Sequence, residues 1–299
     1  MAALGMILTF LLTLTCVGQA IGQCVFPESL TKKSRWETHI RRERIKTESF
    51  YKFNETKLEV QSYFSSSNKR LQSYSCERDM GDNRFVLKLD YNNGGGGGSN
   101  TQFQCMQFVV RSERIVQRYF SEIFTEIDTD DVCSEGMQRD DWPLIYPEMD
   151  GDYSQCPLEG GYTFDMQEYM TGDSLCQSMW LKPRLESECI KGEGLKIEFR
   201  HFDCLGDLSM KLIQKLSCLG SWEEGEYVFT ILTNEDDMWP KLWMMRLPRQ
   251  RETATMHTVL SKDIVADQSD FYGQDGLVPL ENMYDMILTS EMYASLCED

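Results

Sequence analysis

The side chains that could perform chemistry in this chain are its three histidines and eleven cysteines. His201 and Cys204 are separated by two residues, with Cys189 nearby, which is half of a zinc-site pattern. No second pair completes four ligands at the usual spacing, so we expect no bound metal. His39 and His257 lie in no hydrolase or metalloprotease motif. We therefore expect no catalytic site and no cofactor.

Two further patterns could bind ions or phosphates. Acidic residues at 128–131 and 150–152 are calcium ligands by type, but they lack the glycine and terminal glutamate of an EF-hand loop. The glycine run 94–98 lacks the Gly-Lys-Ser/Thr ending of a phosphate-binding loop. We interpret the first two as solvated acidic segments and the glycine run as a hairpin tip.

The cysteines predict disulfides, because residues 1–22 are typical of a secretory signal peptide. An apolar block at 6–17 is followed by small residues just before Gln23. Cys16 leaves with the signal, and an even set of cysteines then enters an oxidising compartment. Spacing leaves the pairing open, and we favour Cys24–Cys133 and Cys76–Cys105 in the first half. The candidates are Cys24, Cys76, Cys105, Cys133, Cys156, Cys176, Cys189, Cys204, Cys218 and Cys297.

The net charge of −18 is divided unevenly along the chain. Residues 24–120 hold 17 Lys and Arg against 11 Asp and Glu, whereas the rest holds 13 against 37. The acidic second half argues against nucleic acid and anionic membranes as partners. No later apolar run reaches the length of a membrane helix. We expect a secreted, extracellular protein without a membrane span.

The basic run between residues 32 and 46 is the candidate binding surface. It suits an acidic extracellular protein or an anionic, heparin-like glycan, and a solvated strand facing the acidic half is the other interpretation. Asn54 begins the sequon Asn-Glu-Thr and is the predicted glycosylation site. The candidate binding residues are Lys32, Lys33, Arg35, Arg41, Arg42, Arg44 and Lys46.

Short predicted β-strands must position these residues. Polar–apolar alternation or β-branched runs predict strands, and 115–127 could be a strand pair or a short helix. Three-and-four spacing of apolar residues predicts helices at 208–217 and, beginning at a proline, at 279–296. The predicted strands are 36–40, 57–63, 85–91, 103–110, 162–166, 195–202, 227–233 and 242–247.

These elements predict a mainly β protein made of two disulfide-stapled modules, barrel-like or sandwich-like, with a C-terminal helix. The length suits two ordinary domains with hydrophobic cores of their own. The expected organisation is a signal peptide at 1–22, a first Cys-rich module at 23–133, a linker at 134–155, and a second Cys-rich module at 156–299.

The motifs CPLEGGYTF at 156–164 and CLGSW at 218–222 carry a resemblance to a known group. With Cys176, Cys189 and Cys204 between them, the chain resembles uncharacterised invertebrate secreted or cell-surface proteins built from tandem Cys-rich domains of unknown function. Modules of that family place a cysteine in the strand after the Cys-Leu-x-x-Trp element. Here that strand reads KLWMMRL, so the resemblance implies Cys297 as the sixth partner.

The expected function is binding of a protein or glycan partner without catalysis. The alternative is a lipocalin-like carrier of a small apolar ligand, with Trp243, Met244 and Met245 as possible lining residues. The first module lacks a Gly-x-Trp element of the lipocalin kind. An enclosed apolar interior would favour the carrier, and a packed core with an exposed charged patch would favour the interaction module.

Overall fold

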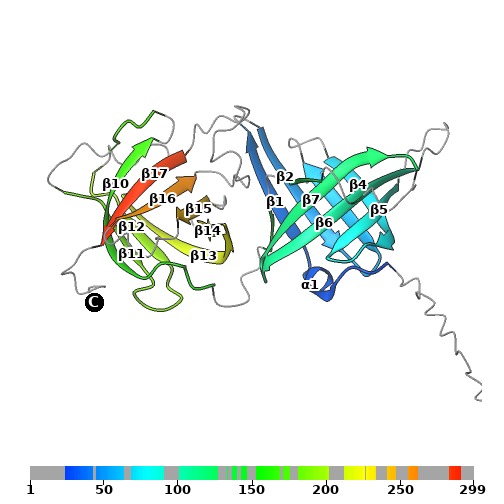
Figure 1. The fold of residues 1–299 in the computed structure, drawn as a ribbon, viewed down its shortest axis with the longest axis horizontal. Coiled ribbons are helices and arrows are strands. Elements are labelled where there is room, and N and C mark those ends of the chain that lie inside the picture. Colours follow the sequence, from blue (N-terminus) through cyan, green and yellow to red (C-terminus); the bar gives the residue numbers. More distant parts are fainter. Residues whose placement is uncertain are drawn as a thin grey trace, which may run out of the picture.

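The computed structural model describes residues 24–42, 45–63, 69–90, 101–126, 133, 137–139, 143–146, 153–168, 171–175, 181–201, 212–225, 227–233, 241–246, 255–261 and 283–290. They form two antiparallel β domains that lie side by side (Figure 1). The expected mainly β fold is confirmed. The signal peptide, the glycine run, Arg44, Cys176, Cys204 and Cys297 lie outside these residues.

The first domain is a nine-stranded antiparallel sheet in the order β6-β5-β4-β3-β2-β1-β9-β7-β8, with β6 also paired to β7. That extra pairing curls the sheet around an inner face. Its elements are α1 (Glu28–Thr31), β1 (Trp36–Arg42), β2 (Ile45–Phe53), β3 (Lys57–Tyr63), β4 (Lys69–Asp79), β5 (Arg84–Asp90), β6 (Gln102–Ser112), β7 (Ile115–Phe124), β8 (Gln138–Arg139) and β9 (Leu144–Ile145). The short strands β8 and β9 therefore place part of the expected linker in the first sheet.

Aromatic side chains fill the inner face of the first domain near α1. The ring of Phe26 lies 5.2 Å from that of Phe53 and 5.0 Å from that of Phe85, centroid to centroid. Such edge-on and tilted ring pairs stabilise a core beyond the area they bury. Trp36 starts β1, and its Nε1 donates to the carbonyl oxygen of Leu30 at 3.1 Å. This bond fixes α1 against the beginning of the sheet.

The second domain is a closed barrel of eight strands joined in chain order, with β17 returning to pair with β10. Closure leaves no unpaired sheet edge. The strands are β10 (Gly160–Glu168), β11 (Arg184–Ser187), β12 (Leu195–Glu198), β13 (Ile213–Glu224), β14 (Tyr227–Thr233), β15 (Lys241–Arg246), β16 (Thr255–Ser261) and β17 (Met283–Ser290). Large apolar side chains occupy the interior, among them Phe164, Phe199 and Trp243, each at most 2% exposed.

The predicted C-terminal helix is wrong, because part of 279–296 forms β17. Met286 and Leu288 point into the barrel and pair in register with Met166 and Phe164 of β10. The predicted helix at 208–217 is also wrong from residue 213 onward, where β13 begins. Gln214, Leu216 and Cys218 alternate as buried positions in that strand. Pairing between distant strands overrides the local spacing in both segments.

The two domains meet where β13 lies against β6. A β-carbon at Gly220 would overlap Ser112 Oγ and lie 2.8 Å from Ile115 Cδ1, so these two side chains pack against the Gly220 backbone and leave no room for a side chain there. Arg111 Nη2 lies 3.3 Å from Glu224 Oε2 across the same contact. The guanidinium of Arg111 also lies 6.0 Å from the ring of Trp222. We call this contact the domain seam.

Candidate functional site

The first part of the predicted basic surface lies around α1 and the start of β1. Lys32 Nζ pairs with Glu28 Oε1 at 2.8 Å, and Lys33 Nζ lies 4.4 Å from the centre of the Tyr146 ring. Arg35 Nη2 pairs with Glu37 Oε1 at 2.5 Å, and the Arg35 guanidinium lies 4.5 Å from the Phe50 ring centre. These cations are therefore held in place by neighbours, while the Lys32 and Arg35 side chains stay 67% and 55% exposed.

The other predicted binding residues belong to the hairpin of β1 and β2. Arg41 pairs in register with Lys46, and Arg42 pairs with Ile45. The structure thus brings these three basic residues to one end of the hairpin, and Arg35 precedes the opposite end of β1. Their side chains, and all of Arg44, lie outside what the structure describes.

Three side chains continue from Arg35 across the outer face of the first sheet. Phe50 of β2 and Tyr63 of β3 pack edge-on with ring centres 5.6 Å apart, and Lys69 Nζ of β4 lies 6.0 Å from the Tyr63 ring centre. Contacts between a cation and an aromatic ring attract the two groups even where the cation remains partly in water. We name Arg35, Phe50, Tyr63 and Lys69 the cation–aromatic row.

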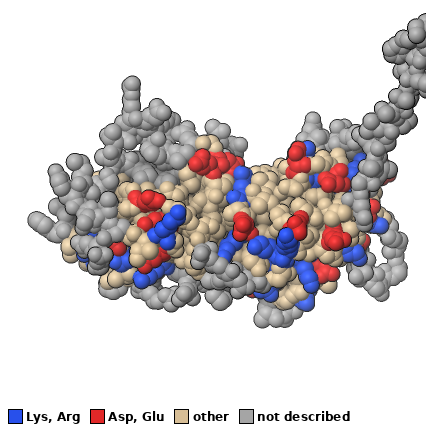
Figure 2. All heavy atoms as spheres, turned by 90° about the horizontal axis from the view of Figure 1, so that it is seen from below, with Lys and Arg blue, Asp and Glu red and all other residues tan. Residues whose placement is uncertain are grey.

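The row has an exposed surround. Leu71 follows Lys69 on the same face of β4 and is 63% exposed. Figure 2 shows, on the face that it presents, Lys and Arg interspersed with Asp and Glu over the described surface. Arg35 belongs to the predicted binding residues, whereas Phe50, Tyr63 and Lys69 were not predicted. The available signal was an aromatic residue at a solvent-facing position of a strand, as for Tyr63 in KLEVQSY.

Asn54 lies in the tight turn between β2 and β3 and is exposed. Its Oδ1 accepts hydrogen bonds from the backbone N–H groups of Thr56 at 3.1 Å and Lys57 at 2.7 Å. The side-chain oxygen therefore closes the turn, as Asn commonly does. The predicted glycosylation site is thus presented at a hairpin tip, and its modification stays a prediction.

Three disulfides join described residues: Cys24–Cys76, Cys105–Cys133 and Cys156–Cys218. The favoured pairing of Cys24 with Cys133 and of Cys76 with Cys105 is wrong. Cys24 sits beside the β2–β3 turn, where Phe26 N donates to Glu55 O, and Cys76 N donates to Thr56 O in the same turn. These contacts bring Cys24 to Cys76 and leave Cys105 for Cys133. The disulfides are those of a protein that folds in an oxidising compartment.

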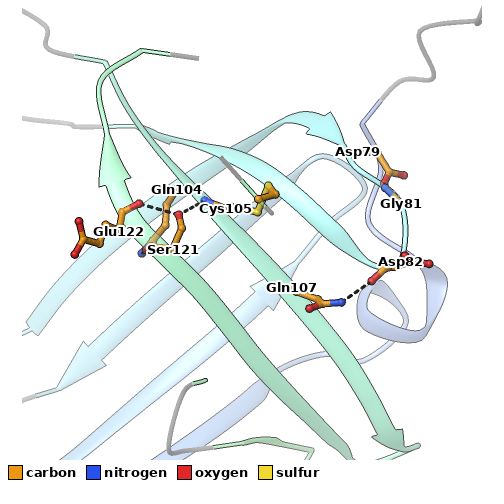
Figure 3. The surroundings of a disulfide bond; sticks show 9 residues. Asp79, Gly81, Asp82, Gln104, Cys105, Gln107, Ser121 and Glu122 are labelled. Carbon is orange, nitrogen blue, oxygen red and sulfur yellow. Dashed lines mark hydrogen bonds between the residues drawn. A yellow bond between two sulfur atoms is a disulfide. The ribbon is translucent and has the colours of Figure 1, made fainter. Parts of the chain in front are cut away.

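Cys105 lies in β6 at an irregularity of the pairing with β7, between Gln104 and Met106. Its backbone N–H donates to Ser121 Oγ at 2.9 Å, and Gln104 Nε2 donates to Ser121 O at 2.9 Å (Figure 3). Side-chain groups thus replace the hydrogen bonds that the irregularity interrupts. The Cys105–Cys133 disulfide is buried on the outer face of the sheet, where it packs with Val86 and Phe103. This environment is structural and offers no reactive thiol.

The Cys156–Cys218 bridge fixes the start of the second domain to β13. Ser154 N donates to Cys218 O at 2.9 Å, and Cys156 N donates to the buried Glu188 Oε1 at 2.7 Å. Cys189 is also disulfide-bonded, and its partner lies outside the described residues. A disulfide sulfur is no zinc ligand, which removes the zinc interpretation with His201. Among the residues that the structure describes, no cluster of His, Cys, Asp and Glu could hold a metal ion.

Two family models match the chain. Residues 20–145 match Domain of unknown function (DUF7043), and residues 152–258 match Domain of unknown function (DUF7042). The chain carries two tandem domains of unknown function. The DUF7043 domain contains the curled sheet with the cation–aromatic row, and the DUF7042 match covers the barrel from its first disulfide through most of β16.

No curated protein and no solved structure matches the chain. The resemblance found in the sequence thus holds at the level of the tandem domains. Within the described part of the chain, no helix has the length and apolar character needed to cross a bilayer.

Proposed function

We propose that this protein is a secreted extracellular interaction module that binds an anionic partner, without catalysis, through the cation–aromatic row. The observation that carries this proposal is the packing of Arg35 and Lys69 on Phe50 and Tyr63 across the outer sheet face. Of the two expected classes of partner, an acidic protein and an anionic glycan, the cation–aromatic row favours the glycan.

The electrostatics of the row support a polyanion. A guanidinium that lies on a ring keeps its N–H groups in one plane, which suits carboxylate or sulfate groups. Arg35 is held both by Phe50 and by Glu37, and Glu37 is itself buried. Its side chain is therefore oriented before a ligand arrives, which lowers the entropic cost of binding.

The shape of the row supports a linear glycan over a folded protein. The two cations stand on opposite sides of two aromatic rings: Arg35 directly precedes β1, and Phe50, Tyr63 and Lys69 lie in the neighbouring strands β2, β3 and β4. Sulfates could meet the cations while the apolar faces of sugars pack against ring edges and the exposed Leu71. This side of the sheet also belongs to the half of the chain that carries an excess of basic residues.

The test is chromatography of the secreted protein on immobilised heparin with a salt gradient. Replacing Lys69 by Gln removes an exposed charge from the row without disturbing the buried Glu37. Replacing Lys191 by Gln removes one exposed charge from the second domain and is the matched control. We expect the native protein and the control to elute together and the row variant at lower salt, because exposed charge pairs are screened by salt.

A third variant separates charge from geometry. Arg35→Lys keeps the charge beside Glu37 but loses the planar group on Phe50, and we expect intermediate elution. Failure of the native protein to be retained would refute the glycan proposal. Equal loss in the row variant and the control would show general electrostatics instead. An acidic protein captured from medium through the row, with no retention on heparin, would also overturn the choice of glycan.

A further inference from the structure

Cys189 has a disulfide partner that the described residues do not contain. The other described cysteines are joined to one another in the three bridges given above. Cys16 falls in the predicted signal peptide, so the candidates are Cys176, Cys204 and Cys297. The strand register of the barrel, and the reach of the chain from the nearest described residue, distinguish among these three.

Cys189 lies at the end of the barrel where β10 begins. Ser187, the last residue of β11, pairs with Gly160, the first residue of β10. The loop from β11 to β12 is closed at its base by the bond from Glu188 N to Gly194 O at 2.9 Å. Cys189 belongs to this loop and therefore lies beyond the ends of both strands. We call this end of the barrel the β11–β12 end.

The chain reaches Cys176 from the opposite half of the barrel. Leu175 precedes it, and the backbone N–H of Leu175 donates to Met166 O at 3.0 Å. Met166 is six residues along β10 from Gly160, which is about 20 Å in a strand, and β11 leads away from Met166 toward Cys189. Cys176 lies within about 3.8 Å of Leu175, Cα to Cα, and bridged cysteines have Cα atoms within about 6.8 Å. Cys176 is therefore too far from Cys189 to be its partner.

The chain to Cys204 also starts from the end opposite the β11–β12 end. Phe199 directly follows β12, and its ring lies 6.1 Å from that of Phe164 on β10, centroid to centroid. The backbone N–H of Phe199 donates to Leu212 O at 2.8 Å. Residues 200–211 therefore leave from and return to the same place.

This arrangement favours Cys176 over Cys189 as the partner of Cys204. Phe164 and Met166 are two residues apart on the inward side of β10, so the two cysteine segments start about 7 Å from each other. A bridge from Cys204 to Cys189 would instead require the chain to run back along the full length of β12, about 13 Å.

The chain toward Cys297 leaves the barrel at the same end as Cys189. Ser290, the last residue of β17, pairs with Tyr162 near the start of β10, and Tyr162 also pairs with Leu185 of β11. The distance from Ser290 to Cys189 is therefore two strand spacings across and four residues along, about 16 Å. Cys297 follows Ser290 by seven residues, which reach about 23 Å when extended. Cys297 is thus within reach of Cys189.

We infer that Cys189 forms a disulfide with Cys297 and that Cys176 forms one with Cys204. One bridge then belongs to each end of the barrel. Each forms when two thiols transfer two electrons and two protons to a disulfide of the oxidising compartment, which is reduced to two thiols. These bridges are independent of the anionic partner proposed above.

The test is a peptide map of the full secreted protein, with free thiols blocked by N-ethylmaleimide before denaturation. Trypsin and a glutamate-specific protease together place each of the four cysteines in a peptide of its own. We expect the peptide of Cys189 to be linked to that of Cys297, and the peptide of Cys176 to that of Cys204. Each linked mass should separate into its two peptides on reduction. Absence of either link overturns the corresponding pairing.

Cys297→Ser supplies a second measurement. It should make Cys189 reactive toward N-ethylmaleimide and leave the other inferred bridge intact. Cys105→Ser is the control in the first domain and should make only Cys133 reactive. The map of the native protein needs no variant, so it decides the outcome even where a variant does not fold. A free thiol at Cys189 in the native protein, or a link from it to any cysteine other than Cys297, overturns the inference.

Discussion

Substitution of Gly220 by alanine tests the reasoning about the domain seam. The new β-carbon would overlap Ser112 Oγ, lie 2.9 Å from Ser112 Cβ, and lie 2.8 Å from Ile115 Cδ1. Ser112 cannot turn away freely, because its Oγ accepts the backbone N–H of Arg114 at 3.2 Å. Overpacking of this kind costs about 1–3 kcal/mol of unfolding free energy. We expect Gly220→Ala to fall in that range.

Urea unfolding followed by tryptophan fluorescence measures the effect. Gly161→Ala is the matched control in another strand, because its β-carbon would meet only Arg184 Nη2 at 3.8 Å. That control should leave the unfolding free energy unchanged or raise it by about 0.4–1 kcal/mol, since alanine restricts the unfolded chain.

A double-mutant cycle identifies the source of the cost. Ser112→Gly removes two of the three overlapping atoms, so Gly220→Ala should cost less in that background, with a coupling of at least about 0.5 kcal/mol. The reasoning is refuted if Gly220→Ala and Gly161→Ala behave alike, or if the cycle shows no coupling between Gly220 and Ser112.

Two further predictions concern the second domain. Replacing Cys156 and Cys218 by serine should lower the unfolding free energy by about 2–5 kcal/mol, measured by urea unfolding, because the unfolded chain gains freedom over 62 residues; a loss under about 1 kcal/mol contradicts this. Burial first, and then the charge of Glu159, raises the pKa of Tyr162 above 10.0. The unfolded tyrosine therefore loses its proton before the folded one, and stability declines as pH rises from 10.0 through the higher folded pKa. Unfolding free energies measured across this range should decline less for Tyr162→Phe, and an identical decline would exclude the effect.

The strands with one solvated face could be predicted from the sequence. In β3 the residues alternate between exposed and buried, with Leu58 and Val60 in the core. In β17 the sequence does not show the alternation, because Met286, Ile287 and Leu288 are all apolar. The structure shows that Met286 and Leu288 are buried and that Ile287 between them is half-buried. Apolar residues at consecutive positions fit helix and strand spacing equally, and the partner strands β10 and β16 decide between them.

The cation–aromatic row and the disulfide pairing could likewise be predicted only in part from the sequence. Arg35 could be found because it lies in a run of basic residues, but its place on Phe50 depends on the pairing of β1 with β2. The partners of Cys24 and Cys105 likewise depend on turns and strand irregularities that bring distant segments together.

The outer face of β14 has a practical consequence for anyone who dissects this chain. Phe229 and Ile231 point away from the barrel core, yet they are 1% and 0% exposed, beside the seam residues Gly220 and Trp222. A second domain expressed alone would uncover apolar surface on this side and would tend to self-associate. Expression of either half should therefore begin from the intact pair, with cleavage between 146 and 153 introduced only after folding.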